Sequence, residues 1–234
     1  LPLIVRVNAL DTGLLLDDLA AVVKAQPYGI MLPKCRSGRD IALVDAYLSA
    51  LEARDGVPQG TLRILPIVTE SAAALFDMSS YAAAGPRLCG MLWGGEDLAA
   101  DVGTVSNRGT DGRYTAPYAL ARSLTLLGAT AAQVPAIDAV YTNFGHPEGL
   151  KAESAEALRD GFSAKAAIHP AQIGPINAAF TPSPDDVSWA RRVIAAFNEA
   201  PERGAIVLDG NMLDRPHYRS AQRVLARAAT THHS

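Results

Sequence analysis

The chain has 234 residues, a hydrophobic content of 49% and a formal net charge of −3. This is enough chain to bury a sizeable core, and one domain is the default expectation. The mildly acidic balance excludes the global basic field that attracts nucleic acid or a membrane surface. No run approaches the ~18 apolar residues of a membrane span, and no signal peptide is recognised. We therefore expect a cytoplasmic protein with neither a nucleic-acid nor a membrane partner.

Short apolar runs alternate with helical patterns along most of the chain. In order, apolar runs bounded by turn residues predict buried strands at residues 3–7, 29–33, 64–68, 88–93, 137–141 and 166–168. Helices are predicted between them, from Leu15, after Ser37, from Ala72, from Pro117 and around Leu150. Ser37 and Asp40 have the spacing of a capping box, and residues 104–115 have the composition of a loop.

Strands that alternate with helices indicate a parallel sheet with right-handed crossovers. Six such units fit both a doubly wound open sheet and a (β/α)₈ barrel that lacks two units. No Gly-x-Gly-x-x-Gly motif follows a strand and no Walker-type loop is present, which weakens a nucleotide-binding interpretation. Cys35 and Cys89 lie near the ends of different apolar runs, so we expect reduced thiols rather than a disulfide.

The chain after residue 180 departs from the alternating pattern. Ser183 and Pro184 predict the N-cap and first turn of a helix. Residues 205–213 predict a hairpin around Asp-Gly-Asn, and a last helix follows over about residues 217–228. We place a boundary between residues 180 and 181 and expect the extension to cover its own subunit or to reach a neighbouring one.

Two predicted strands are followed by acidic residues. Glu70 follows the run 64–68, and Asp97 follows the run 88–93 after Gly94 and Gly95. In a parallel barrel, the carboxyl ends of the strands carry the chemistry. Two carboxylates on neighbouring strands could hold one hard divalent cation such as Mg²⁺. The alternative is that each acid only interacts favourably with the dipole at a helix N-terminus, which contributes under ~1 kcal/mol of stability.

Two cations also stand out beside predicted strands. Arg6 lies inside an apolar run, where a buried charge needs a partner, so it predicts either a substrate contact or a structural ion pair. Lys34 follows the second run and predicts either a contact with phosphate or substrate, or an ordinary surface position. Gly94 and Gly95 would let a substrate carboxylate approach the backbone closely.

Several segments, in this order along the chain, resemble the citrate lyase β-subunit-like family of CoA-ester lyases in the HpcH/HpaI aldolase/citrate lyase superfamily. These segments are Val5–Asn8, Met31–Lys34, Pro66–Glu70, Trp93–Leu98, Ile168–Ile173, Phe180–Pro184 and Asp209–Pro216. Together they cover essentially the whole chain.

The resemblance implies a (β/α)₈ TIM barrel with a C-terminal extension. Residues 1–180 would form the catalytic barrel and residues 181–234 a lid over its own or an adjacent subunit. The first two βα units of the family, including an acidic strand end, have no counterpart here. The chain also opens inside an apolar run without Met, so we expect its natural N-terminus to lie upstream. Residues 143–146 depart from the acidic residues common in that loop of the family, which bears on substrate choice.

The resemblance also implies a Claisen-type lyase. It would cleave, or form in reverse, a 3-hydroxy-3-carboxyacyl-CoA such as malyl-, citramalyl- or citryl-CoA, giving an acyl-CoA and a 2-oxo acid. Glu70 and Asp97 would hold Mg²⁺, with Mn²⁺ as an alternative. Arg6 would stabilise the enolate at the thioester oxygen, and Asp214 of an adjacent subunit would protonate its carbon.

Lys34, Gly94 and Gly95 would join Arg6 in binding substrate, and the active species would be a homotrimer or a hexamer. Two other interpretations stay open. One is a metal-dependent aldolase acting on free 2-oxo-3-deoxy acids, against which the extension argues. The other is a non-catalytic subunit of a larger lyase complex. A thioesterase step on the product is a further alternative.

Overall fold

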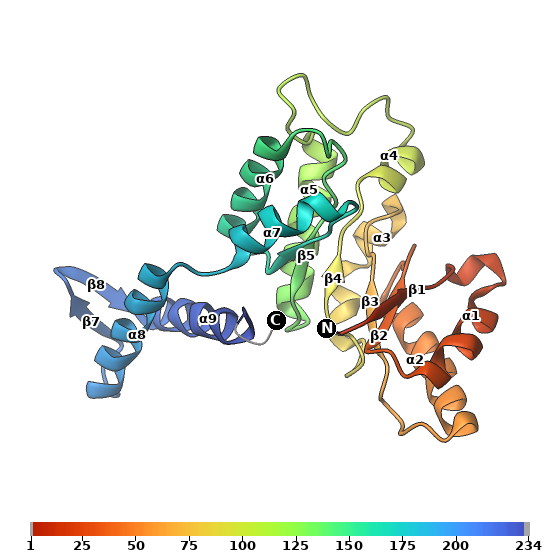
Figure 1. Ribbon diagram of the computed structural model, residues 1–234, viewed down its shortest axis with the longest axis horizontal. Helices are drawn as coiled ribbons and strands as arrows, with labels where there is room; N and C mark the ends of the chain where they lie inside the picture. The colour runs from red at the N-terminus through yellow and green to blue at the C-terminus, as the bar shows by residue number, and fades with distance from the viewer. Residues whose placement is uncertain (1, 232–234) are drawn as a thin grey trace. The chain divides into compact units, whose positions relative to one another are not determined.

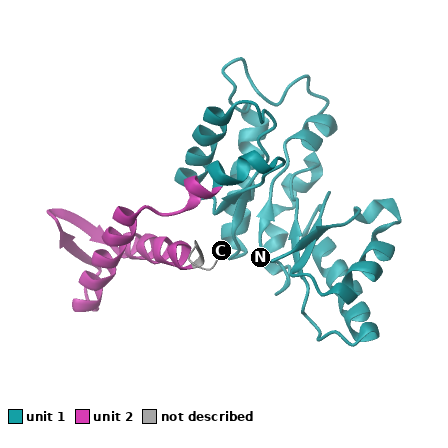
Figure 2. Ribbon diagram, in the orientation of Figure 1, with its two compact units in different colours: residues 1–176 teal, residues 177–234 magenta. Residues whose placement is uncertain are grey.

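The computed structural model describes residues 2–231, and the chain divides into two compact units, residues 1–176 and 177–234 (Figure 2). The predicted boundary at residue 180 coincides with the end of a helix, Ile173–Phe180, that runs across this division. Within the described residues, no helix combines the length and the apolar character needed to cross a membrane.

The first unit contains parallel strands that pair in the order of the sequence (Figure 1). One sheet pairs β1 with β2 and β2 with β3, a second pairs β4 with β5 and β5 with β6, and parallel bridges from Ile64 to Leu88 and from Ile67 to Leu92 join the two. The strands are β1 (Ile4–Arg6), β2 (Gly29–Leu32), β3 (Arg63–Pro66), β4 (Met91–Leu92), β5 (Ala136–Asp138) and β6 (Ala164–Lys165). A doubly wound sheet reverses its strand order at a switch point. No reversal occurs among the described strands, so the order favours the barrel over the doubly wound alternative.

Helices connect these strands. They are α1 (Leu15–Val22), α2 (Gly38–Asp55), α3 (Ala72–Phe76), α4 (Glu96–Val102), α5 (Ala116–Ala131), α6 (Pro147–Asp160) and α7 (Ile173–Phe180), with short 3₁₀ helices η1 (Leu10–Thr12), η2 (Val23–Ala25), η3 (Met78–Ala83) and η4 (Pro170–Gln172). Figure 1 shows α1 and α2 beside β1–β3, and α5 beside β4 and β5, while α6 packs against β6.

The core between strands and helices is mainly apolar and also holds buried ion pairs. Ile30 and Ile64 on the strands and Leu48 on α2 are fully buried. Arg87 is also buried and donates to both carboxylate oxygens of Glu52, at 2.8 and 2.6 Å. Burial opposes the charge on Glu52, but the hydrogen bonds from Arg87 and from backbone amides hold the pKa of Glu52 below its usual value. This pair ties the last part of α2 to the segments before β3 and β4.

Two predictions need correction. The sixth strand is Ala164–Lys165 rather than 166–168. Ser37 is the N-cap of α2 but makes no capping bond with its side chain. The backbone N–H of Asp40 donates to the Ser37 carbonyl at 3.1 Å, and the Asp40 carboxylate accepts the backbone N–H of Arg36 at 2.7 Å. The helices α4 and α7 were not predicted. The other predicted strands and helices are present with shifted ends, and both cysteines are free.

The second unit packs two helices against a hairpin. It contains α8 (Pro184–Glu199), β7 (Ala205–Leu208), β8 (Asn211–Asp214) and α9 (Arg215–Thr231). The predicted cap is confirmed: the Ser183 hydroxyl accepts the N–H of Asp186, whose side chain accepts the N–H of Ser183 in return. The predicted hairpin is confirmed too, and its two-residue turn places Asp209 and Gly210 at φ of 51° and 79°, as a type I′ turn requires.

Candidate active site

The predicted site residues of the first unit follow neighbouring parallel strands. Arg6 is the last residue of β1, and Lys34, Glu70 and the segment 94–97 follow β2, β3 and β4 in turn. Because the carboxyl ends of parallel strands lie at one edge, the fold brings these residues to the same edge, where the active sites of barrel enzymes are built.

Glu70 is a buried carboxylate beside a second carboxylate. The residue is only 8% exposed, and its Oε2 accepts a hydrogen bond from the backbone N–H of Lys34. Burial and the neighbouring Asp97 raise the pKa of Glu70 above its usual value, against the Lys34 hydrogen bond and the charge of Arg6. A positive charge between Glu70 and Asp97 would relieve both effects.

Lys34 contacts both carboxylates. Its φ of 52° lies in the left-handed region, which costs a non-glycine residue about 1–3 kcal/mol and tends to occur at functional sites. Its backbone N–H donates to Glu70, and its Nζ lies 3.8 Å from Oδ1 of Asp97. Both side chains of this long ion pair are about half exposed, so it contributes little stability. The Asp97 carboxylate therefore stays available to a ligand.

The donor set at this edge consists of two carboxylates. Within residues 2–231, no group of three or more His, Cys, Asp or Glu side chains is placed to hold a metal ion. Mg²⁺ usually takes one or two carboxylates and completes its shell with water and substrate oxygens. Glu70 and Asp97 fit that requirement.

Gly94 lies directly against Glu70. A Cβ at Gly94 would lie 3.2 Å from Cγ of Glu70 and 3.3 Å from Cγ2 of Ile67, so a side chain would displace the carboxylate. The Gly94 N–H already donates to the Thr69 hydroxyl at 2.9 Å. No hydrogen bond from the Gly95 amide is found in the described part of the chain. Of the two predicted glycine amides, only that of Gly95 is available to a substrate.

Arg6 is exposed, so the prediction of a buried charge inside this strand is wrong. The reason is incomplete cover: among the described strands β1 pairs only with β2, and Ile4 and Val5 are themselves half-buried. No ion pair with Arg6 occurs within residues 2–231. Its charge nevertheless lowers the pKa of Glu70, so the guanidinium lies within electrostatic reach of that carboxylate.

Asp214 belongs to the second unit, at the end of β8. Its Oδ1 lies 2.6 Å from Nδ1 of His217 on the first turn of α9, and this contact lowers the pKa of Asp214. The spacing of three between these residues at a helix start is a sequence signal for such a contact.

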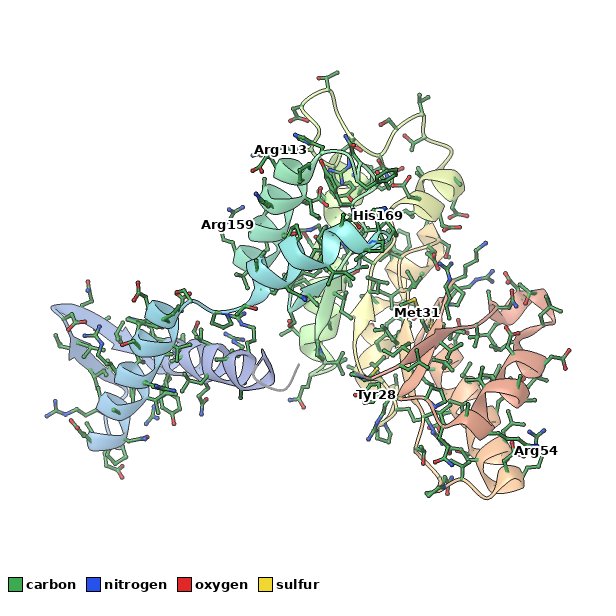
Figure 3. The ribbon with its side chains drawn as sticks, in the orientation of Figure 1. Tyr28, Met31, Arg54, Arg113, Arg159 and His169 are labelled. Carbon is green, nitrogen blue, oxygen red and sulfur yellow. The ribbon has the colours of Figure 1, made fainter. Side chains whose placement is uncertain are left out.

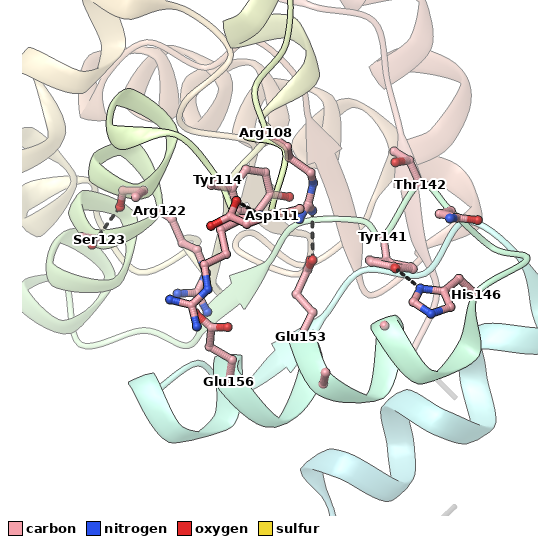
Figure 4. Close-up of a pocket in the computed structure, with 16 residues that line it drawn as sticks. Arg108, Asp111, Tyr114, Arg122, Ser123, Tyr141, Thr142, His146, Glu153 and Glu156 are labelled. Carbon is pink, nitrogen blue, oxygen red and sulfur yellow. Dashed lines mark hydrogen bonds and ion pairs between the residues drawn. The ribbon is translucent and has the colours of Figure 1, made fainter.

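A cavity of about 680 Å³ opens where the chain leaves β5, between the loop 104–115 and the helices α5 and α6 (Figure 4). Arg108 and Glu153 form an ion pair in its wall, and the Tyr141 hydroxyl contacts His146. Arg113, on the loop, also lines it (Figure 3). Asn143 and His146 therefore belong to the cavity, which was not predicted.

Two family models match this chain. The HpcH/HpaI aldolase/citrate lyase model matches residues 1–170, and a model of carbon–carbon bond lyases of the TIM-barrel fold matches residues 115–231. The chain belongs to the HpcH/HpaI aldolase/citrate lyase family. This confirms the family predicted from the motifs and the α/β, TIM-barrel-type fold.

Curated relatives have several activities. The citrate lyase subunit beta-like protein of Mycobacterium tuberculosis is 36% identical over 96% of this chain and 76% of the relative. The (3S)-malyl-CoA thioesterase of Cereibacter sphaeroides is 36% identical over 96% of this chain and 73% of its own. The mitochondrial citramalyl-CoA lyase of Mus musculus is 32% identical over 97% of this chain and 68% of the relative.

Solved structures of relatives include ligand complexes. The protein CitE from Mycobacterium tuberculosis, in complex with magnesium, acetoacetate and coenzyme A, has a TM-score of 0.75 at 35% identity and covers 97% of this chain and 78% of that one. A citrate lyase from Burkholderia xenovorans has a TM-score of 0.82 at 26% identity, over 97% of this chain and 72% of that one.

Proposed function

We propose that this protein is a Mg²⁺-dependent carbon–carbon lyase acting on a 3-hydroxy-3-carboxyacyl-CoA such as malyl-, citramalyl- or citryl-CoA. The products are an acyl-CoA and a 2-oxo acid, and the reverse condensation uses the same site. The observation that carries the proposal is the buried Glu70 carboxylate, with its raised pKa, beside Asp97 at the carboxyl edge of the strands. The lyase among the curated relatives and the relative complexed with magnesium and coenzyme A support it.

Glu70 and Asp97 hold the metal in this proposal, with Mn²⁺ as an alternative to Mg²⁺. When bound, the ion supplies Lewis-acid stabilisation of the substrate alkoxide and orients the part that leaves as the 2-oxo acid. The backbone N–H of Lys34 fixes Glu70 in the required orientation. Lys34 and the Gly95 amide would bind the substrate carboxylate, because both present donors beside the carboxylate pair.

Cleavage moves negative charge from the hydroxyl to the thioester. The hydroxyl gives up its proton to solvent water, the carbon–carbon bond breaks, and the bonding electron pair enters the thioester as an enolate while the former carbinol carbon becomes the carbonyl carbon of the 2-oxo acid. Arg6 is the proposed partner of the enolate oxygen. Its guanidinium is permanently charged, offers a planar set of donors and is exposed at the edge where the substrate would lie.

The enolate carbon then takes up one proton, which balances the proton lost by the hydroxyl. We assign this step to Asp214. The contact with His217 lowers the pKa of Asp214 and favours its carboxylate, the form that takes the proton from the α-carbon in the reverse condensation and returns it in cleavage. Asp214 would act in the site of an adjacent subunit, which requires a homo-oligomer, a trimer or a hexamer.

The test is an assay of the purified protein with malyl-, citramalyl- and citryl-CoA, with Mg²⁺ and with a chelator. We expect cleavage of at least one thioester only when the divalent metal is present. Cleavage that a chelator does not affect would overturn the metal assignment. Activity on free 2-oxo-3-deoxy acids alone would favour the aldolase alternative, and activity that needs added partner proteins would favour a subunit of a larger complex.

A further inference from the structure

The indole of Trp93 is fixed by contacts on several sides. Trp93 is 1% exposed and immediately precedes the glycine pair of the candidate site. Its Nε1–H donates to Oδ1 of Asp138, at the end of β5, at 2.7 Å. The ring of Tyr114 packs against it edge-on, with centroids 4.8 Å apart. The indole therefore has little freedom to rotate.

Asp138 is itself held by cations. It is 1% exposed and accepts hydrogen bonds from Nζ of Lys165 at 2.8 Å and from Nε of Arg122 at 3.1 Å, besides the indole of Trp93. These donors come from β6 and α5 respectively. A buried carboxylate with three donors from three separate segments has a closely defined position.

The contacts close into a ring. Lys165 also donates to Glu153 on α6 at 2.7 Å, and Arg108 donates to the other oxygen of Glu153 at 2.9 Å. The Arg108 guanidinium in turn lies 3.8 Å above the Tyr114 ring, and Tyr114 packs on Trp93. Figure 4 shows the Arg108–Glu153 pair with Tyr114 beside it. This ring joins the segment after β4 to β5, β6, α6 and the loop 104–115.

The fixed indole of Trp93 packs against the turn that carries Asp97, a candidate metal ligand. A Cβ built on Gly95 would lie 3.2 Å from Cζ3 of Trp93, so the indole lies directly against the Gly95 backbone. Gly95 is the N-cap of α4, and Asp97 lies in the first turn of that helix. We infer that Trp93, held by Asp138, is a positioning residue that fixes the turn presenting Asp97 beside Glu70. This inference rests on the proposed metal site.

The first experiment is Trp93→Phe, which removes the indole N–H and keeps an aromatic ring in the core. Mg²⁺ binding to the purified protein is measured by calorimetry, and amide hydrogen exchange is measured over residues 93–98. We expect the Kd for Mg²⁺ to rise by about tenfold, the lower end of the effect of groups that orient metal ligands. We also expect faster exchange in this segment.

Two further variants separate positioning from stability. Glu52→Gln weakens an equally buried ion pair away from this edge, so it should lower Tm while leaving the Kd for Mg²⁺ and the exchange of residues 93–98 unchanged. Asp138→Asn keeps an oxygen that accepts the Trp93 N–H but removes the charge that faces Lys165. It should therefore lower Tm, with a smaller rise in Kd than Trp93→Phe.

Wild-type Kd and wild-type exchange in Trp93→Phe would overturn the inference, and so would an equal rise in Kd in Glu52→Gln. If the wild-type protein itself does not bind Mg²⁺, the proposed metal site fails. Hydrogen exchange then still decides whether Trp93 holds the turn: unchanged exchange in Trp93→Phe refutes that role, and faster exchange supports it.

Discussion

At the scale of single residues, the buried charge of Glu70 destabilises the folded protein, and a bound cation would offset this destabilisation. Its folded pKa lies above the usual glutamate value of 4.5, because of burial first and Asp97 among the other causes. At pH values between the pKa of Glu70 in the unfolded state and its pKa in the folded state, the native state binds more protons than the unfolded state. The stability that Glu70 contributes without metal is therefore full below the usual pKa and is lost as the pH rises through the raised one.

Glu70→Gln tests this cost. At pH 7 without metal, the variant should melt at or above the wild-type Tm, because the neutral amide avoids the buried charge. Mg²⁺ at 100 times its Kd should stabilise the wild type by about 2.7 kcal/mol, or about 5–10 °C in a chain of this size. Thermal melts with and without Mg²⁺ measure both effects. An equal Mg²⁺-induced shift in the variant would contradict the assignment of Glu70.

Arg6→Lys tests the enolate partner. An ammonium keeps the charge but cannot reproduce the planar guanidinium fork. Loss of one preorganised donor at a developing oxyanion typically costs ~10²–10³ in rate, and we expect a fall in kcat of that order. Steady-state kinetics with the thioester substrate measure it. Arg54→Lys, at the end of α2, is the matched control (Figure 3). A kcat near that of the wild type in Arg6→Lys would rule out this role.

At the scale of elements, the sequence predicts those with an apolar pattern and misses those without one. The sixth strand was placed two residues late because Lys165 is charged, and only the distant Asp138 and Glu153 make its burial tolerable. Helix α4 buries only Leu98, and α7 buries only Ile176, so neither has a repeating apolar face to detect.

The same reasoning applies to the candidate site. Glu70, Lys34 and Asp97 lie within four residues after predicted strands, so the barrel pattern and the family motifs were enough to select them. Their actual contacts depend on the left-handed backbone at Lys34, which no pattern indicates. The ring around Asp138 consists of isolated charges far apart in the sequence, and only the fold brings them together.

The capping box of α8 gives a prediction at this scale. Ser183→Ala removes the acceptor for the N–H of Asp186 and should destabilise the second unit by about 1 kcal/mol. Urea unfolding measures the change. The kcat of the folded protein should stay unchanged, since Ser183 is neither a proposed metal ligand nor a proposed substrate-binding or catalytic residue. Ser188→Ala, on the exposed side of the same helix, is the control and should leave stability almost unaffected. Equal stability of both variants would show that the cap contributes nothing.

At the scale of the whole molecule, the proposal requires subunits that complete one another's sites. Glu70 lies in the first unit and Asp214 in the second. Mixing inactive Glu70→Ala chains with inactive Asp214→Asn chains should restore partial activity, because some interfaces then pair an intact Glu70 with an intact Asp214. The assay follows refolding of the mixture, with each variant refolded alone as control. If mixed oligomers form and no activity returns, the shared site is refuted.

The proposed reaction breaks the carbon–carbon bond of the substrate and leaves its thioester bond intact. The most direct measurement is the product stoichiometry from malyl-, citramalyl- or citryl-CoA in the presence of Mg²⁺, followed by mass spectrometry. We predict one acyl-CoA and one 2-oxo acid for each substrate consumed, and neither product from Glu70→Gln. Free coenzyme A together with the intact hydroxy acid would instead identify a thioesterase and contradict the account.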